Sequence, residues 1–304
     1  MGTETLRELV ERLGMSSRAL AALGAAMQAR ASGGGPLDPG VQARLDEVVE
    51  ALGARQLIDG ADPDELRPVL GGIRTELFLG ARLVSERPPG AAWSDTDPAV
   101  LQAAGDVSTG FPAALEHSVA PRLDGLPERL AAADASFLDV GVGVGAMAVE
   151  MARRWPSLRV AGVDTWAPSV ALARDAVRAA GLADRIELRE QGAEDLPDED
   201  RFDLAWVPGV FISERALPSV VARVGRALRP GGWLLLACAG PGADPLASAL
   251  ARLRTALWGG AQLSPAEFEN LLARSGLVEV SFLPRPPGST VALLAGRRPQ
   301  AASA

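Results

Sequence analysis

Hydrophobic residues recur along this chain with two different periods, one in the first third and another in the rest. In the first third, apolar residues stand three or four positions apart, which is the spacing along one face of an α-helix. Thr5–Leu13 follows this pattern, and a second helix is predicted from Ser17 towards Gln28. Asp62 followed by Pro63 is typical of a helix start. The first third is therefore predicted to be helical and to contain no strand.

From Ser136 onwards, short apolar runs alternate with helical segments. The predicted strands are 137–140, 158–164, 186–190, 202–207, 232–238, 277–282 and 290–295. The predicted helices between them are 145–155, 168–180, 217–228, 245–257 and 265–274. Strands that alternate with helices are joined by right-handed crossovers and form a mostly parallel sheet. Only the short turn Pro286–Ser289 separates the last two strands, so they should pair antiparallel. We therefore expect an α/β domain over residues 131–304, after a helical domain over residues 1–130.

Composition narrows the classes of partner. A hydrophobic content of 48% and a charged content of 22% are typical of a globular protein. The formal net charge of −8 argues against nucleic acid and against an anionic membrane surface. Cys238 is the single cysteine and is expected to be buried in a strand, so neither an intrachain disulfide nor a thiolate metal cluster is expected. No apolar run reaches the roughly 18 residues of a membrane span, and no signal pattern begins the chain, so we expect a cytoplasmic protein.

The most informative segment is Phe137–Ala146. An apolar run containing Asp139 leads there into Gly141, Gly143 and Gly145. A strand, a tight turn and a helix start form a cradle for a nucleotide cofactor, because glycines let backbone N–H groups approach the ligand closely. The glycine spacing alone also fits a dinucleotide site. Asp139 would repel a pyrophosphate, however, and would suit a cofactor that carries an ammonium and a sulfonium.

Acidic residues follow the next two predicted strands. Asp164 comes 23 residues after Gly141 (164 − 141) and ends the second strand. An acidic residue about 20 residues beyond the first glycine is placed to accept hydrogen bonds from ribose hydroxyls, although it could instead cap the following helix. Gly192–Asp195 follows the third strand, at the edge of the sheet where an adenine would lie. Arg229–Gly232 is predicted to be a turn before the fifth strand.

In this order and spacing, the segments resemble the class I S-adenosylmethionine-dependent methyltransferases. The matching segments are Leu138–Gly145, Val160–Asp164, Gly192–Pro197, Phe202–Leu204 and Leu228–Gly232. Leu257–Gly260 together with Ser264–Glu267 resembles the C-terminal part of the bacterial small-molecule type. The resemblance implies a Rossmann-like, mostly parallel sheet with an antiparallel C-terminal strand. It also implies S-adenosylmethionine as cofactor, a small molecule of secondary metabolism as methyl acceptor, and a helical cap or dimerisation region that supports a homodimer.

The same resemblance implies roles for individual residues. The cofactor-binding residues would be Asp139, Gly141, Gly143, Gly145, Asp164, Thr165, Trp166, Ala193, Glu194, Val207 and Pro208. Asp139 and the glycines would hold the methionine part, Asp164 the ribose, and Thr165 and Trp166 the adenine. The adenine edge would meet Ala193 and Glu194, while Val207 and Pro208 would sit beside the methyl group. Many relatives have Asp where this chain has Gly192, so the adenine contact is expected to shift to Glu194 or to backbone.

The acceptor side offers few titratable groups. Methyl transfer is an in-line displacement that depends mainly on proximity and a dry site, and a base is needed only if the acceptor must lose a proton. Many related O-methyltransferases place a histidine after the fifth strand, where this chain has only Asp244. The sole histidine, His117, is the candidate catalytic base, with a surface role as the alternative. Five aromatic residues are candidates for an acceptor pocket or for ordinary core packing: Trp93, Phe111, Trp206, Phe211 and Trp258.

Three interpretations remain open at this level. The favoured one is methylation of a small hydrophobic acceptor, on the oxygen of a carboxylate or phenol, with nitrogen or carbon as alternatives. The second is a methyltransferase-like fold with a non-methylating or non-catalytic role, because function depends on the acceptor site and not on the fold. The third is an NAD-dependent oxidoreductase that uses the glycine loop for a dinucleotide.

Overall fold

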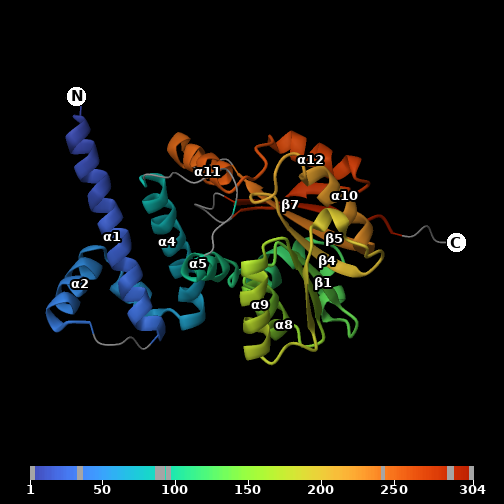
Figure 1. Cartoon of the computed structure of the whole chain (residues 1–304), viewed down its shortest axis with the longest axis horizontal. Helices are drawn as coiled ribbons and strands as arrows, with labels where there is room; N and C mark the ends of the chain where they lie inside the picture. Colours follow the sequence, from blue (N-terminus) through green and yellow to red (C-terminus); the bar gives the residue numbers. More distant parts are fainter. Residues whose placement is uncertain are drawn as a thin grey trace. The chain divides into compact units, whose positions relative to one another are not determined.

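The computed structural model describes residues 4–32, 37–85, 93, 97–240, 244–285 and 291–300 (Figure 1). The chain divides into two compact units. The first comprises residues 1–88 and 102–110, and the second comprises residues 89–101 and 111–304. Helix α5 (Pro98–Ser108) contributes residues to both units. The expected division into functional domains 1–130 and 131–304 stays a prediction.

The first unit is helical in its described residues, as the sequence predicts. It contains α1 (Leu6–Ser32), α2 (Pro39–Ala51), α3 (Arg55–Gly60), α4 (Pro63–Leu83) and the last part of α5. Asp62 begins α4 with a capping box, in which its side chain accepts from the backbone N–H of Asp64 and the Glu65 carboxylate accepts from the N–H of Asp62.

The prediction of two separate helices before Gln28 is wrong, because α1 is continuous. Gly14 lies within it, and a glycine in a helix interior is less favourable than alanine by only about 1 kcal/mol. Packing offsets that cost: Met27 is buried and Leu20 and Leu23 are partly buried in a cluster that includes Ile73 of α4.

The second unit is built around a seven-stranded sheet among the residues that the structure describes, in the order β3-β2-β1-β4-β5-β7-β6. The strands are β1 (Ser136–Val140), β2 (Arg159–Asp164), β3 (Ile186–Glu190), β4 (Phe202–Pro208), β5 (Leu228–Ala239), β6 (Val278–Phe282) and β7 (Val291–Arg297). Strands β1 to β5 pair in parallel, and β7 is antiparallel to both β5 and β6. The predicted α/β fold with an antiparallel C-terminal strand is therefore confirmed.

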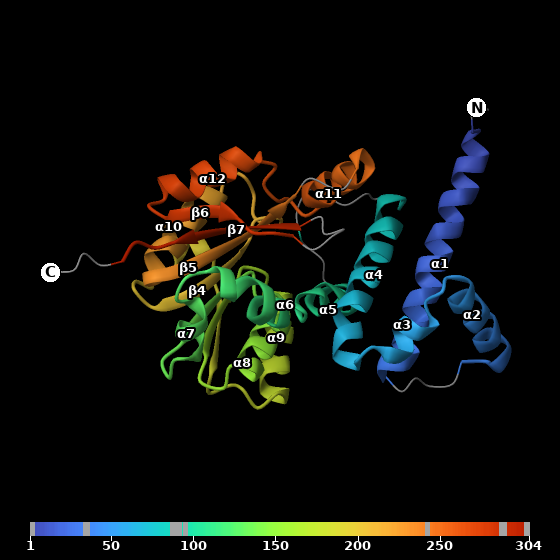
Figure 2. The same cartoon turned by 180° about the vertical axis from the view of Figure 1, so that it is seen from behind.

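Helices cover both faces of this sheet (Figure 2). The helical segments are α6 (Phe111–Ala114), a π-helical turn (Leu115–Val119), η2 (Ala120–Arg122), α7 (Leu126–Ala131), α8 (Ala146–Arg154), α9 (Ala167–Ala179), η3 (Ala193–Asp195), α10 (Leu217–Ala227), α11 (Pro245–Leu257) and α12 (Pro265–Arg274). Buried residues of α7, α8 and α9 pack with one face of the sheet in a first hydrophobic core. Buried residues of α10 and α12 pack with the opposite face in a second core. Alternation along β5 supplies both cores: Leu235 faces the first, and Leu234 and Leu236 face the second.

Strand β5 begins earlier than the sequence predicts. Phe202 pairs with Leu228 and Leu204 pairs with Trp233, so the extra residues of β5 form a bulge opposite β4. Gly231, with φ +76°, provides the left-handed conformation there. The predicted turn at Arg229–Gly232 is thus an irregular part of the strand. The predicted turn at Pro286–Ser289 lies outside the described residues.

Candidate active site

The glycine loop connects β1 to α8 at the carboxyl edge of the sheet. Gly141, Gly143 and Gly145 have φ values of +68°, +54° and +78°, which L-residues with side chains rarely adopt. The N–H groups of Gly141 and Val142 both donate to the Val163 carbonyl, at 2.8 and 3.0 Å, and so anchor the loop to β2. Gly145 precedes the first residue of α8. The loop therefore has the tight backbone path that a cofactor cradle requires.

Asp164 fixes the centre of this loop from the end of β2. Its Oδ2 accepts from the N–H of Gly143 at 2.9 Å, and its Oδ1 accepts from the N–H of Trp166 at 2.8 Å. The side chain thus stabilises both the loop and the start of α9. Burial raises the pKa of Asp164, and these backbone hydrogen bonds oppose the rise. A carboxylate has about four lone-pair positions, so these bonds, together with one from the Thr165 backbone, leave capacity for a ribose hydroxyl.

Asp139 is a buried carboxylate with an oxygen that lacks a partner. Its side chain is on a residue that is 1% exposed, and Oδ2 forms no hydrogen bond with any described residue. Burial, together with the nearby negative charge of Asp164, raises the pKa of Asp139 to about 8. An orphaned buried carboxylate oxygen costs free energy unless a donor or a cation satisfies it. The site is therefore suited to a positively charged ligand group.

The end of β4 contributes two predicted residues with different orientations. The Pro208 ring borders the loop, because a Cβ added to Gly141 would lie 3.1 Å from Pro208 Cγ. Val207 is fully buried in the core beneath α10 and α12, so only its backbone faces the edge. Trp206, the register partner of Asp139, has its side chain on the opposite face of the sheet from Val207.

A small apolar cluster includes residues of the glycine loop and of the start of α8. Leu101, Val144 and Ala146 are buried together, and Trp93, Trp166 and Leu172 pack against them. The predicted residue Trp166 therefore packs against a cluster that includes Val144 of the loop. Sequence analysis missed Leu101 and Leu172, because a single leucine within a helix carries no signal that distinguishes it from other leucines.

Two of the predicted adenine residues, Ala193 and Glu194, lie in η3, and Thr165 follows β2. Ala193 is buried, and Thr165 and Glu194 are exposed. The Glu194 carboxylate lies directly over Gly192, where an added Cβ would be 2.6 Å from Glu194 Oε2. The Glu194 carboxylate can occupy this position because Gly192 has no side chain. The expectation that the adenine contact shifts to Glu194 or to backbone stays a prediction.

The five predicted aromatic residues form two groups in the second unit. Trp93 and Phe211 meet edge to face with centroids 5.6 Å apart, and Phe211 stacks on Trp258 at 4.5 Å. The N–H of Ala261 donates to the Gly209 carbonyl at 3.2 Å, which ties the segment after α11 to the loop after β4. The second group is the pair Phe111 and Trp206, with centroids 4.5 Å apart. Aromatic residues that are widely separated in sequence are therefore brought together near the ends of β4 and α11.

The candidate bases are placed less favourably. His117 lies in the π-helical turn with a side chain that is 70% exposed, and its Nε2 is 3.3 Å from Arg154. Arg154 is the last residue of α8, and the glycine loop lies at the other end of this helix. Arg154 is therefore roughly 12 Å from the loop along the helix axis. Asp244 is the N-cap of α11 and accepts from the N–H of Ala247 at 2.8 Å. A catalytic role of His117 stays a prediction.

The fold and these residues together are suited to binding a nucleotide cofactor. A glycine loop after β1, an acidic residue at the end of β2 and an orphaned buried carboxylate next to the loop lie at one edge of a doubly covered parallel sheet. The two carboxylates Asp139 and Asp164 fit a cationic cofactor better than a pyrophosphate, which is anionic.

Residues 137–232 match the family described as a methyltransferase domain. This segment of the chain is therefore similar to methyltransferase domains. Among curated relatives, methyltransferase GfsG from Streptomyces halstedii is 38% identical over 114 residues, which are 37% of this chain and 41% of that protein. The U6 snRNA (guanine-N(2))-methyltransferase THUMPD2 of Mus musculus is 32% identical over 109 residues, 34% of this chain and 21% of that protein. The matched segments thus span less than half of these relatives.

Solved structures share the fold over nearly the whole chain. PigF with S-adenosylhomocysteine has a TM-score of 0.63 at 17% identity and covers 97% of this chain and 100% of its own. An O-methyltransferase family protein from Burkholderia thailandensis has a TM-score of 0.61 at 17% identity, with coverage of 98% and 99%. Within the part of the chain that the structure describes, no helix is long and apolar enough to cross a membrane. The same residues contain no group of three or more His, Cys, Asp or Glu side chains arranged to hold a metal ion.

Proposed function

We propose that the whole protein transfers a methyl group from S-adenosylmethionine to a small hydrophobic acceptor, on the oxygen of a carboxylate or phenol. The observation that carries this proposal is the contact chain Trp93–Phe211–Trp258 next to the loop after β4. Phe211 is 36% exposed, so this aromatic surface is not closed off as ordinary core. Half-buried aromatic side chains are suited to an apolar or aromatic ligand.

The residues around the loop fit S-adenosylmethionine. The Asp139 carboxylate would pair with the amino group, Asp164 would accept from the ribose hydroxyls, and Glu194 would accept from the adenine edge. When bound, the cofactor supplies a methyl group activated by a sulfonium. The buried surroundings of Asp139 strengthen its attraction for a cation, because the effective dielectric constant there is low.

The chain's own residues act mainly by positioning the acceptor. Among the described titratable side chains, Arg254 lies beside the aromatic chain, with its guanidinium carbon 5.2 Å from the centre of the Trp258 ring. We infer that the acceptor reacts as an anion, or loses its proton easily, and that holding it in line in a dry site provides most of the rate enhancement. An acceptor carboxylate or acidic phenol meets this requirement at neutral pH.

Two alternative functions are an RNA methyltransferase and a protein with a non-methylating role. An RNA acceptor has the support of the similarity to THUMPD2, and a non-methylating role has the support of fold similarity alone. The net charge of −8 favours a small molecule over RNA. A homodimer, a cytoplasmic location and a cap function for residues 1–130 stay predictions.

Radiolabelled S-adenosylmethionine would test these alternatives. The full chain would be incubated with a panel of aromatic carboxylic acids and phenols, and in parallel with total RNA, and mass spectrometry would locate the added methyl group. We expect label in small-molecule products. Label in RNA alone would contradict the proposed acceptor, and stabilisation of the protein by NAD but not by S-adenosylhomocysteine would contradict the cofactor itself.

A further inference from the structure

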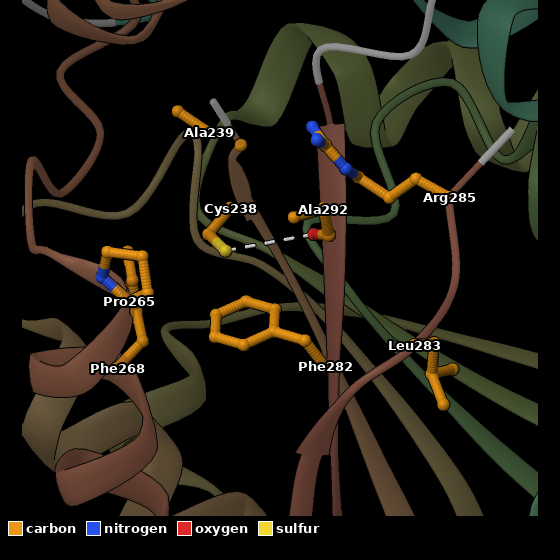
Figure 3. A pocket seen from close by; sticks show the side chains of 9 residues that line it. Cys238, Ala239, Pro265, Phe268, Phe282, Leu283, Arg285 and Ala292 are labelled. Atoms are coloured by element: carbon orange, nitrogen blue, oxygen red, sulfur yellow. Dashed lines mark hydrogen bonds between the residues drawn. The ribbon is translucent and has the colours of Figure 1, made fainter. Parts of the chain in front are cut away.

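A cavity of about 210 Å³ lies at the carboxyl end of β5, apart from the residues assigned to the cofactor and the acceptor (Figure 3). Its walls include Cys238 from the end of β5, Gly240 just after that strand, Phe268 from α12, Phe282 from β6, Ala292 from β7, and Arg285. The cavity therefore joins β5, the antiparallel strands and α12. All of its lining belongs to the second compact unit.

The cavity has the size and surface of a site for a small apolar ligand. An engineered protein cavity of about 150 Å³ with apolar walls holds benzene, so this one has room for a six-membered ring with a short substituent. Phe268, Cys238 and Ala292 are buried at its inner end, whereas Arg285 is exposed. The cavity thus runs from the surface to the sheet.

Arg285 is the one charged residue among the described residues that line the cavity. Its guanidinium lies over Gly240, because a Cβ built on Gly240 would overlap Nη1 of Arg285 (Figure 3). A guanidinium presents a planar set of donors that matches a carboxylate in a bidentate pair. In a protein with a net charge of −8, such a local cation provides selectivity for an anion that the rest of the surface would repel.

The thiol within the cavity does not compete for that cation. Burial raises the pKa of Cys238 to about 12, and the Arg285 charge opposes the rise. Cys238 is therefore neutral at physiological pH, and its Sγ donates to the Ala292 carbonyl at 3.7 Å. The cavity combines apolar walls, a neutral thiol and one cation.

We propose that this cavity binds a small apolar carboxylic acid, with the apolar body between Phe268 and Phe282 and the carboxylate on Arg285. None of these residues belongs to the candidate cofactor or acceptor residues, so the inference does not depend on the proposed methylation.

Phenylacetate and its neutral analogue phenylacetamide would test the site by isothermal titration calorimetry on the full chain saturated with S-adenosylhomocysteine. We expect phenylacetate to bind about tenfold more tightly than phenylacetamide, because a hydrogen bond to a charged group is stronger than one between neutral groups. Arg285→Gln should bind the two compounds equally. Arg274→Gln, which removes an exposed arginine at the other end of α12, should keep the preference of the wild type.

Gly240→Ala provides a second variant that leaves the charge in place. The added Cβ would displace the guanidinium from its position over residue 240, so the preference for the acid should fall while the net charge is unchanged. Absence of phenylacetate binding to the wild type would overturn the proposal, as would an acid preference that survives Arg285→Gln. Unchanged S-adenosylhomocysteine affinity in Arg285→Gln would separate a failure of this site from a failure of the cofactor site.

Discussion

Replacement of Asp139 by asparagine removes the buried carboxyl group on which the cofactor assignment rests. In the folded protein, burial and the Asp164 charge raise the pKa of Asp139 from 3.8 to about 8. An acid whose folded pKa is raised binds more protons in the folded than in the unfolded state between these values. The free energy of unfolding therefore falls as the pH rises from about 4 to about 8, and the full loss is present above about pH 8. At about 1.36 kcal/mol per pKa unit, the upper limit of this loss is about 6 kcal/mol.

Asp139→Asn should therefore stabilise the unliganded protein in alkaline solution while it weakens cofactor binding. At about pH 9, the thermal unfolding midpoint of the unliganded variant should exceed that of the wild type, and the two should converge near pH 5. Affinity for S-adenosylhomocysteine should fall by roughly tenfold or more at about pH 9, because the variant lacks the charge that pairs with the ligand's amino group.

Titration calorimetry in two buffers of different ionisation enthalpy would measure the linked proton. With a pKa of about 8, roughly nine tenths of Asp139 is protonated at pH 7, so cofactor binding should release close to one proton in the wild type and none from this site in the variant. Asp59→Asn, at an exposed position on α3, is the matched control and should behave as the wild type. Equal proton release and equal affinity in wild type and Asp139→Asn would refute the assignment.

The remaining predictions concern the loop, the acceptor surface and the histidine. Gly143→Val should abolish measurable binding of S-adenosylhomocysteine in calorimetry, because a β-branched residue is strained at φ +54°. Asp164→Ala should also abolish this binding. Near-native affinity in both variants would contradict the assignment of the cofactor site. Trp258→Ala should lower kcat/KM for an aromatic acceptor about tenfold or more without changing cofactor affinity, since it removes the ring that stacks on Phe211. An equal loss of cofactor affinity would show instead that the ring stabilises the cofactor site as well as the acceptor surface. His117→Ala should retain most of the turnover of the wild type, and a loss of several orders of magnitude would establish it as a base.

Sequence patterns predicted the elements of the second unit closely, because local signals determine them. The helices Pro245–Leu257 and Pro265–Arg274 begin and end where predicted, each with a polar N-cap followed by proline. Short connections made the last two strands antiparallel, as expected. The glycine loop was also readable in sequence, since its left-handed conformations require glycine and its neighbours are within a few residues.

Contacts between residues far apart in the chain determine the features that the sequence patterns did not predict. Gly14 is a local helix-weakening residue, yet α1 continues through it because its later turns pack against α4. The start of β5 depends on pairing with β4, which the turn-like residues before Trp233 do not reveal. Trp206 and Val207 were both predicted to be site residues, but strand alternation sends their side chains to opposite faces.

The sequence by itself therefore determined the fold class, the cofactor loop and the acidic residues around it, because these follow from backbone conformation and spacing within single β–α units. Tertiary structure alone decided the orphaned state of the Asp139 carboxyl group, the contact chain of aromatic residues and the cavity beneath Arg285. These features depend on burial and on contacts between residues far apart in the chain, and no local pattern of residue types specifies which distant side chains will meet.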